Sequence, residues 1–119
     1  MEDTFGQKLR TLRRTKGITQ RKLAERTGVD FSYISKLEND RVPPPAADTV
    51  VRICEALSVD PDELLAVTGK MPVQIQQSVG SSPAAIQFLR SAQNMRLSEA
   101  EWGQLSEQLK QLRQQHPRR

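Results

Sequence analysis

The fold is decided by residues 20–39, which read QRKLAERTGVDFSYISKLEN. Two short helices are expected in this stretch, over residues 20–26 and 31–38. Helices that cross closely need a small side chain at the crossing, and Ala24 supplies it. The turn between them needs a backbone with a positive φ, which Gly28 adopts at little cost. The stretch therefore predicts a helix-turn-helix unit.

Apolar residues recur where this helix pair would pack onto the rest of its domain: Leu23, Val29, Ile34 and Leu37. Thr27 stands where an aliphatic side chain is commoner, and we expect its methyl group to pack there instead. Asp30 directly precedes the second helix, and acidic side chains cap helices well at that position. We therefore interpret Asp30 as a helix cap and not as a base contact.

Start and stop residues on both sides predict more helices. Thr4 with Gln7 gives a capping box before a helix over 5–16, Thr19 caps the helix that begins at residue 20, and Asp60 caps a helix over 61–67. A helix over 46–57 follows three prolines at 43–45, because proline cannot continue a helix. The predicted core comprises Phe5, Leu9, Leu23, Ile34, Leu37, Val50, Ile53 and Leu57.

Residues 70–82 have a different, Gln-rich composition that ends in Gly-Ser-Ser, and they predict a mostly extended linker. Beyond it, Ser82-Pro83 opens a helix over 83–94, and the capping box Ser98/Glu101 opens another over 99–114. The predicted organisation is a domain at 1–69, the linker, a helical hairpin at 83–115 and a tail at 116–119.

Composition and charge narrow the function. The chain has 119 residues and a net charge of +4, while residues 8–41 carry ten Lys/Arg and four Asp/Glu. Such a basic block is typical of a nucleic-acid-binding surface, with a solvated helix face as the alternative. The single cysteine, Cys54, excludes a disulfide framework, and we interpret it as a small core residue. No other potential metal ligand accompanies His116 in the tail, so a metal site is not expected there.

Neither a catalytic motif nor a phosphate-binding loop is present. We therefore expect no enzyme, cofactor or metal. The absence of an apolar run of about 18 residues predicts no membrane span, and the acidic start Met1-Glu2-Asp3 predicts no signal peptide. A cytoplasmic protein is expected.

The residues 5–69 resemble the phage-repressor-type (Cro type, or XRE) helix-turn-helix domain. The resemblance rests on matching motifs at 9–13 (LRTLR), 17–20 (GITQ), 23–24 (LA), 28–29 (GV) and 33–39 (YISKLEN), with proline before the fourth helix. It implies an all-α fold: a five-helix, λ-repressor-like DNA-binding domain plus the C-terminal two-helix hairpin. It also implies that Arg13 pairs with Glu38, and that Arg10 is either free or a second partner.

In such a domain the helix over 31–38 enters the major groove of double-stranded DNA. Candidate base contacts on its outward face are Phe31, Ser32, Ser35 and Lys36; for Phe31 the alternative is a partly buried cap residue. Candidate phosphate contacts are Gln20, Arg21, Tyr33, Asn39 and Arg41, and for each arginine the alternative is a plain surface charge.

The C-terminal hairpin shows more apolar residues than two helices can hide: Ile86, Leu89, Trp102, Leu105, Leu109 and Leu112. Its stretch around 89–102 is similar to the Sin-type multimerisation hairpin. A homodimer through residues 83–115 is therefore expected, with a hairpin folded back on a monomer as the alternative.

Three functions remain open from the sequence. The first is a sequence-specific transcriptional repressor that binds palindromic operators as a dimer. The second is an antitoxin or controller protein whose hairpin binds a toxin, an antirepressor or a regulatory peptidase. The third is an adaptor on this fold that does not read DNA.

Overall fold

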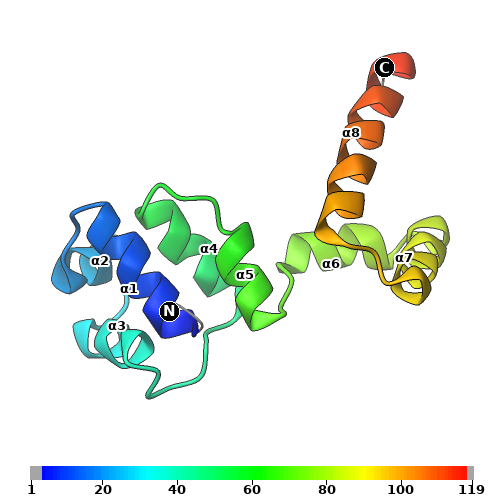
Figure 1. Cartoon of the computed structure of the whole chain (residues 1–119). Helices are drawn as coiled ribbons and strands as arrows, with labels where there is room; N and C mark the ends of the chain where they lie inside the picture. Colours follow the sequence, from blue (N-terminus) through cyan, green and yellow to red (C-terminus); the bar gives the residue numbers. More distant parts are fainter. Residues whose placement is uncertain (1–3, 118–119) are drawn as a thin grey trace. The chain divides into compact units, whose positions relative to one another are not determined.

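The computed structural model describes residues 4–117, and every regular element in that range is a helix (Figure 1). The helices are α1 (Phe5–Thr15), α2 (Gln20–Thr27), α3 (Phe31–Glu38), α4 (Ala47–Ala56), α5 (Asp62–Thr68), α6 (Val73–Gly80), α7 (Pro83–Met95) and α8 (Glu99–Gln115). The predicted all-α fold is confirmed. The chain divides into two compact units, the first ending at Gln77 and the second beginning at Ser78.

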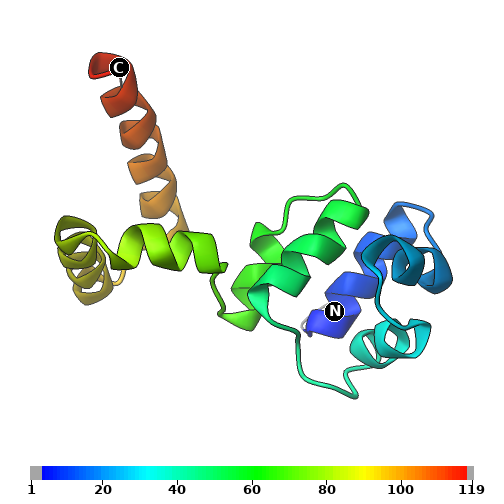
Figure 2. The same ribbon diagram turned by 180° about the vertical axis from the view of Figure 1, so that it is seen from behind.

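The first unit packs α1–α5 around one apolar core. Helix α1 contacts α3 and α5, α2 contacts α3 and α4, and α4 contacts α5; Figure 2 shows the same packing from behind. Every core residue predicted from the sequence is buried, and Ala24, Ala47, Leu64 and Leu65 join them. This core positions α3 against both α1 and α2.

Cys54 is fully buried in this core, as predicted. Burial, with a smaller contribution from the charge of Asp60, raises the pKa of its thiol to about 11. The thiolate that would react with an oxidant is therefore scarce at neutral pH.

Most helix ends follow the predicted local rules. The Thr4/Gln7 and Ser98/Glu101 capping boxes both form, Thr19 accepts the N–H of Lys22, and Ser82 accepts the N–H of Ala85. Gly28 ends α2 with a φ of 76°, as its place in the turn requires. Thr27, whose methyl group was expected to pack, donates its hydroxyl to the carbonyls of Leu23 and Ala24.

Two predicted caps differ. Asp30 occupies the N-cap position of α3, but its side chain makes no capping hydrogen bond. The N–H of Tyr33, which a capping side chain would accept, bonds to the backbone carbonyl of Asp30 instead. Asp60 accepts the N–H of Asp62, yet the helix begins one residue later than predicted, with Pro61 as its N-cap.

The prediction of a mostly extended linker over 70–82 is wrong, because residues 73–80 form α6. The carbonyl of Pro72 accepts the N–H of Gln76 and starts the first turn. Glutamine is a good helix former, and no glycine or proline interrupts residues 73–79. A Gln-rich composition was thus a poor guide to an extended backbone.

The second unit contains α7 and α8, joined by a turn at residues 96–98 in which Arg96 has a φ of 52°. The predicted bounds of both helices hold to within about a residue. The two helices diverge from the turn (Figure 1), leaving an open groove with a cavity of about 280 Å³ between them. Among residues 78–117, Ala92 alone is buried.

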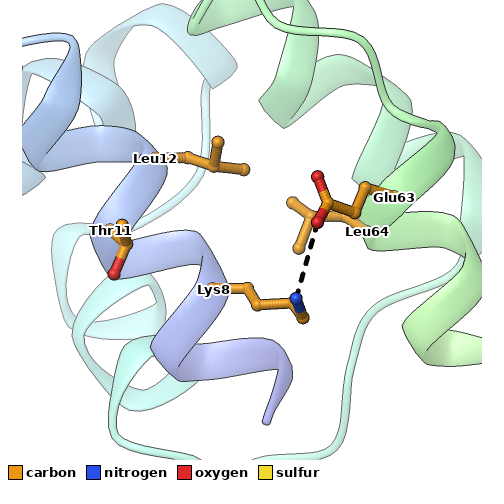
Figure 3. A pocket seen from close by; sticks show the side chains of 5 residues that line it. All are labelled: Lys8, Thr11, Leu12, Glu63 and Leu64. Carbon is orange, nitrogen blue, oxygen red and sulfur yellow. Dashed lines mark ion pairs between the residues drawn. The ribbon is translucent and has the colours of Figure 1, made fainter. Parts of the chain in front are cut away.

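A small cavity of about 70 Å³ lies between α1 and α5, lined by the five side chains drawn in Figure 3. Lys8 Nζ lies 3.5 Å from Glu63 Oε1 across its mouth. The volume is far below that of a typical small-molecule site. Within residues 4–117 no helix is long and apolar enough to cross a membrane, and no cluster of three metal-binding side chains occurs.

Candidate nucleic-acid interface

The helix α3 has one face fixed in the core and another face open to solvent. Ile34 and Leu37 are buried against the core, whereas Phe31, Ser32 and Lys36 are exposed. Residues four apart lie on one face of a helix, so Phe31 with Ser35 and Ser32 with Lys36 form two adjacent rows that together make a strip. Ser35 belongs to this strip but is half-buried.

The far end of α3 is held by a buried ion pair. Arg13 donates to Glu38 from Nε and from Nη2, the latter at 2.9 Å, which confirms the pair implied by the resemblance. Gln20 Nε2, at the start of α2, donates to the same carboxylate at 3.0 Å. Burial by itself would raise the pKa of Glu38, but these hydrogen bonds and the charge of Arg13 outweigh it and hold that pKa below its ordinary value of 4.5. Glu38 therefore stays charged and ties α1, α2 and α3 together.

Arg10 is the second partner, and the alternative of a free Arg10 is wrong. Its Nη2 donates to Asn39 Oδ1 at 2.7 Å and its Nε lies 3.5 Å from Glu38 Oε1. Asn39 Nδ2 in turn donates to the carbonyl of Ser35 at 2.8 Å. Asn39 thus carries the contact from α1 into the last turn of α3.

Asp40 closes α3 and caps α1 at once. Its φ is 56°, and the N–H groups of Asp40 and Arg41 bond back to the carbonyls of Leu37 and Lys36, which is the Schellman ending of a helix. The carboxylate of Asp40 accepts the N–H of Gly6 at 2.9 Å and the hydroxyl of Thr4 at 2.7 Å. The backbone at Arg41 is thereby fixed at the end of α3.

Gly6 permits this approach of α1 to α3. A Cβ atom there would collide with the carbonyl of Leu37 and lie 2.7 Å from that of Glu38. Only a residue without a side chain allows the two backbones to come so close.

Arg21 and Phe31 form a stacked pair at the other end of α3. The guanidinium carbon of Arg21 lies 4.7 Å from the centre of the Phe31 ring, within the range of a cation–π contact. Phe31 is 40% exposed and directly follows the N-cap residue Asp30, so the alternative of a partly buried residue at the helix cap stays open.

The predicted site residues thus fall into three groups. Phe31, Ser32, Lys36, Arg21, Asn39 and Arg41 are exposed; Ser35 and Tyr33 are half-buried, with Tyr33 packed against the core; and Gln20 is half-buried on Glu38. Their contacts with DNA remain predictions. The sequence reasoning missed the Arg21–Phe31 stack and the Asp40 cap on α1, because both join residues that are distant in the chain.

This geometry coincides with a known family: the family described as "Helix-turn-helix domain" matches residues 4–67, more than half of the chain. The chain belongs to this helix-turn-helix domain family. Membership of a helix-turn-helix family supports the expectation, made from the sequence, that the protein is not an enzyme.

Curated relatives carry the same description. The chain is 34% identical to the "Uncharacterized HTH-type transcriptional regulator RghRB" of Bacillus subtilis over 62% of its length and 55% of the relative's. It is 33% identical to the "HTH-type transcriptional repressor RghR" of the same organism, over 56% of its length and 50% of the relative's. A Sinorhizobium fredii protein, "Uncharacterized HTH-type transcriptional regulator y4dJ", is 35% identical over 60% of this chain and 92% of its own. The chain thus spans about half the length of the two Bacillus relatives.

Among solved structures, the SinR protein/SinI protein complex is similar over 93% of this chain and 99% of that chain, with a TM-score of 0.51 and 21% identity. At this identity the similarity shows the fold alone. It agrees with an all-helical, λ-repressor-like arrangement.

Proposed function

We propose that this protein is a sequence-specific transcriptional repressor that binds a palindromic operator as a dimer, with α3 in the major groove. The observation that carries the proposal is the mounting of α3. One face is locked to α1 and α2 through Glu38, while the opposite strip presents Phe31, Ser32 and Lys36 to solvent. A reading helix needs both a fixed position and free side chains.

Charge supports the same surface. Residues 8–41 carry a net charge of +6, and several of these cations form no ion pair with any described residue, 4–117. Lys36 and Arg41 are examples: within residues 4–117 no ion pair engages either of them. On this proposal Lys36 donates to a base edge, whereas Arg41, at the fixed end of α3, contacts a phosphate that sets the register.

The second unit supports the dimer because it has almost no core of its own. Large apolar side chains on α7 and α8 are exposed, with Leu109 at 65% and Leu112 at 57%. Ile86, Leu89 and Trp102 are also exposed, while Leu105 is half-buried in the groove beside α7. Isolated helices of this length are barely stable in water, so a covering surface is required. A second copy of the chain offers an identical surface and matches the symmetry of a palindrome.

A protein antagonist is the second candidate for the same surface. The similar solved structure is a complex of two named proteins, SinR and SinI. If this second candidate holds for the present protein, the exposed residues of α7 and α8 bind a different chain, and the protein acts as an antitoxin or controller. Whether it acts as a repressor or as a controller, the protein proposed here binds bacterial or phage DNA, and it therefore works in the cytoplasm.

The dimer is tested by comparing the parent with Leu109→Asp, which places a charge on the exposed apolar surface, and with Gln111→Asp as a matched control two residues away. We expect the parent and Gln111→Asp to be dimers by light scattering at tens of micromolar. Leu109→Asp should be a monomer and should bind a palindromic site about 100-fold more weakly, because linked half-sites gain from effective concentration.

Two results would contradict the proposal. A parent that is already monomeric at tens of micromolar removes the homodimer and favours the antagonist. A folded parent that shows no salt-sensitive DNA binding at all favours the adaptor that does not read DNA.

A further inference from the structure

The strongest unassigned feature is the stack of Arg21 on Phe31. Arg21 is the second residue of α2, Phe31 is the first residue of α3, and their groups lie 4.7 Å apart. Both side chains are exposed. The pair therefore sits at the amino end of α3, where a helix in the major groove approaches base edges most closely.

The stack holds Arg21 without using its hydrogen-bond donors. Other arginines use their donors within the protein: Arg13 donates to Glu38, Arg10 donates to Asn39, and Arg26 donates to the carbonyl of Ala56 at 3.1 Å. Within the described residues 4–117, no hydrogen bond or ion pair engages the guanidinium of Arg21. A guanidinium that is held by an aromatic ring, and not by a hydrogen bond, keeps its five N–H donors free.

A ring contact at 4.7 Å limits where the guanidinium of Arg21 can lie, which a phosphate contact does not require. A phosphate is satisfied by a positive charge within reach, and flexible side chains serve it well. Bidentate donation to guanine O6 and N7 needs a planar group at a set angle, and arginine is the side chain that matches it best. An aromatic ring beside it can contact the methyl group of a thymine.

Building on the DNA-binding function proposed above, we propose that Arg21 is a specificity-determining residue that reads a guanine, with the Phe31 ring as its platform. Phe31 contacts a thymine at the neighbouring base pair. The two residues then read one dinucleotide together. This role replaces the phosphate contact expected for Arg21 from the sequence.

The test uses the full chain and its selected DNA site. The preference for each base is measured by titrating single-base variants of that site with the parent, Arg21→Lys, Arg21→Ala, Phe31→Leu and, as a control, Lys36→Ala. Arg21→Lys keeps the charge but loses the planar fork. We expect it to lose a guanine preference of about 5- to 150-fold at one position per half-site, while the salt slope is unchanged.

Phe31→Leu supplies the sharper readout. The substitution keeps an apolar side chain, and residue 31 does not contact the guanine in the proposed arrangement. It should nevertheless weaken the same guanine preference, because the guanidinium of Arg21 loses the ring that holds it. Lys36→Ala should leave that position unchanged and alter another. Urea denaturation of each variant checks that the domain is folded, which the exposure of these side chains leads us to expect.

Three outcomes would overturn the inference. The first is an Arg21→Lys variant that keeps every base preference of the parent. The second is an Arg21→Ala variant that weakens all sequences alike and flattens the salt slope by about one unit, which identifies a phosphate contact. The third is a parent that binds all DNA alike, and this result overturns the proposed function itself.

Discussion

Glu38 is the residue on which the mounting of α3 depends most, and Glu38→Gln removes its charge with little change of shape. In the parent, Arg13 donates twice to the carboxylate, Gln20 once, and Arg10 lies at its edge. The amide leaves the buried cation of Arg13 without a counter-charge. Removing one partner of a buried ion pair costs about 3–5 kcal/mol, a large part of the 5–15 kcal/mol by which domains are stable.

The assay is urea unfolding followed by circular dichroism at pH 7, with Glu63→Gln as the matched control. Glu63 also pairs with a cation, Lys8, but its side chain is 77% exposed. Exposed pairs contribute little, so the control should lose less than about 1 kcal/mol. We expect Glu38→Gln to lose at least three times as much.

The dependence on pH gives a second readout of the same group. The pKa of Glu38 is lowered in the folded chain, so its contribution to the free energy of unfolding is complete above its ordinary value of 4.5. That contribution is lost as the pH falls below 4.5 and through the lowered pKa. The parent should therefore lose more stability in acid than Glu38→Gln does. Equal acid sensitivity, or a Glu38→Gln variant within about 1 kcal/mol of the parent at pH 7, would refute the argument.

Three further predictions follow from other parts of the first unit. Gly28→Val should destabilise the domain in urea by about 1–3 kcal/mol, since it forces a β-branched residue to a φ of 76°, whereas Gly28→Asn should cost less; equal losses would contradict this. Lys36→Ala should weaken operator binding by about 1–3 kcal/mol and relax one base position, while Arg41→Ala should weaken all sequences alike; titrations on matched and mismatched sites distinguish the two. Cys54 should resist a thiol reagent at pH 8 until urea unfolds the chain, and rapid labelling of the folded protein would disagree with its burial and raised pKa.

Features set by neighbours in the chain could be predicted from the sequence. Thr4 with Gln7 and Ser98 with Glu101 lie three residues apart, so their capping boxes could be recognised by spacing alone. Gly28 could be predicted because the turn needs a positive φ, which glycine adopts at little cost. The core residues could be predicted because apolar residues recur at helical spacing along the sequence.

Features that depend on tertiary approach could not be predicted in this way. Asp40 caps α1 although it lies more than thirty residues further along the chain, and no residue near Gly6 in the sequence indicates this hydrogen bond. The Arg13–Glu38 pair came from family resemblance, whereas the donation from Gln20 and the position of Arg10 came only from the fold. At α6 the error was local, because glutamines were interpreted as linker composition rather than as helix formers.

The central claim is that two copies of α3 read two related half-sites, and selection of bound DNA from a random pool by the full chain tests it most directly. We predict an enriched palindrome whose half-sites are separated by about one helical turn, about 10 base pairs from centre to centre, or by a multiple of it. Repeating the selection with Lys36→Ala should relax one position in each half-site. A pool that stays random after selection, or a single asymmetric site unaffected by that substitution, would contradict the claim.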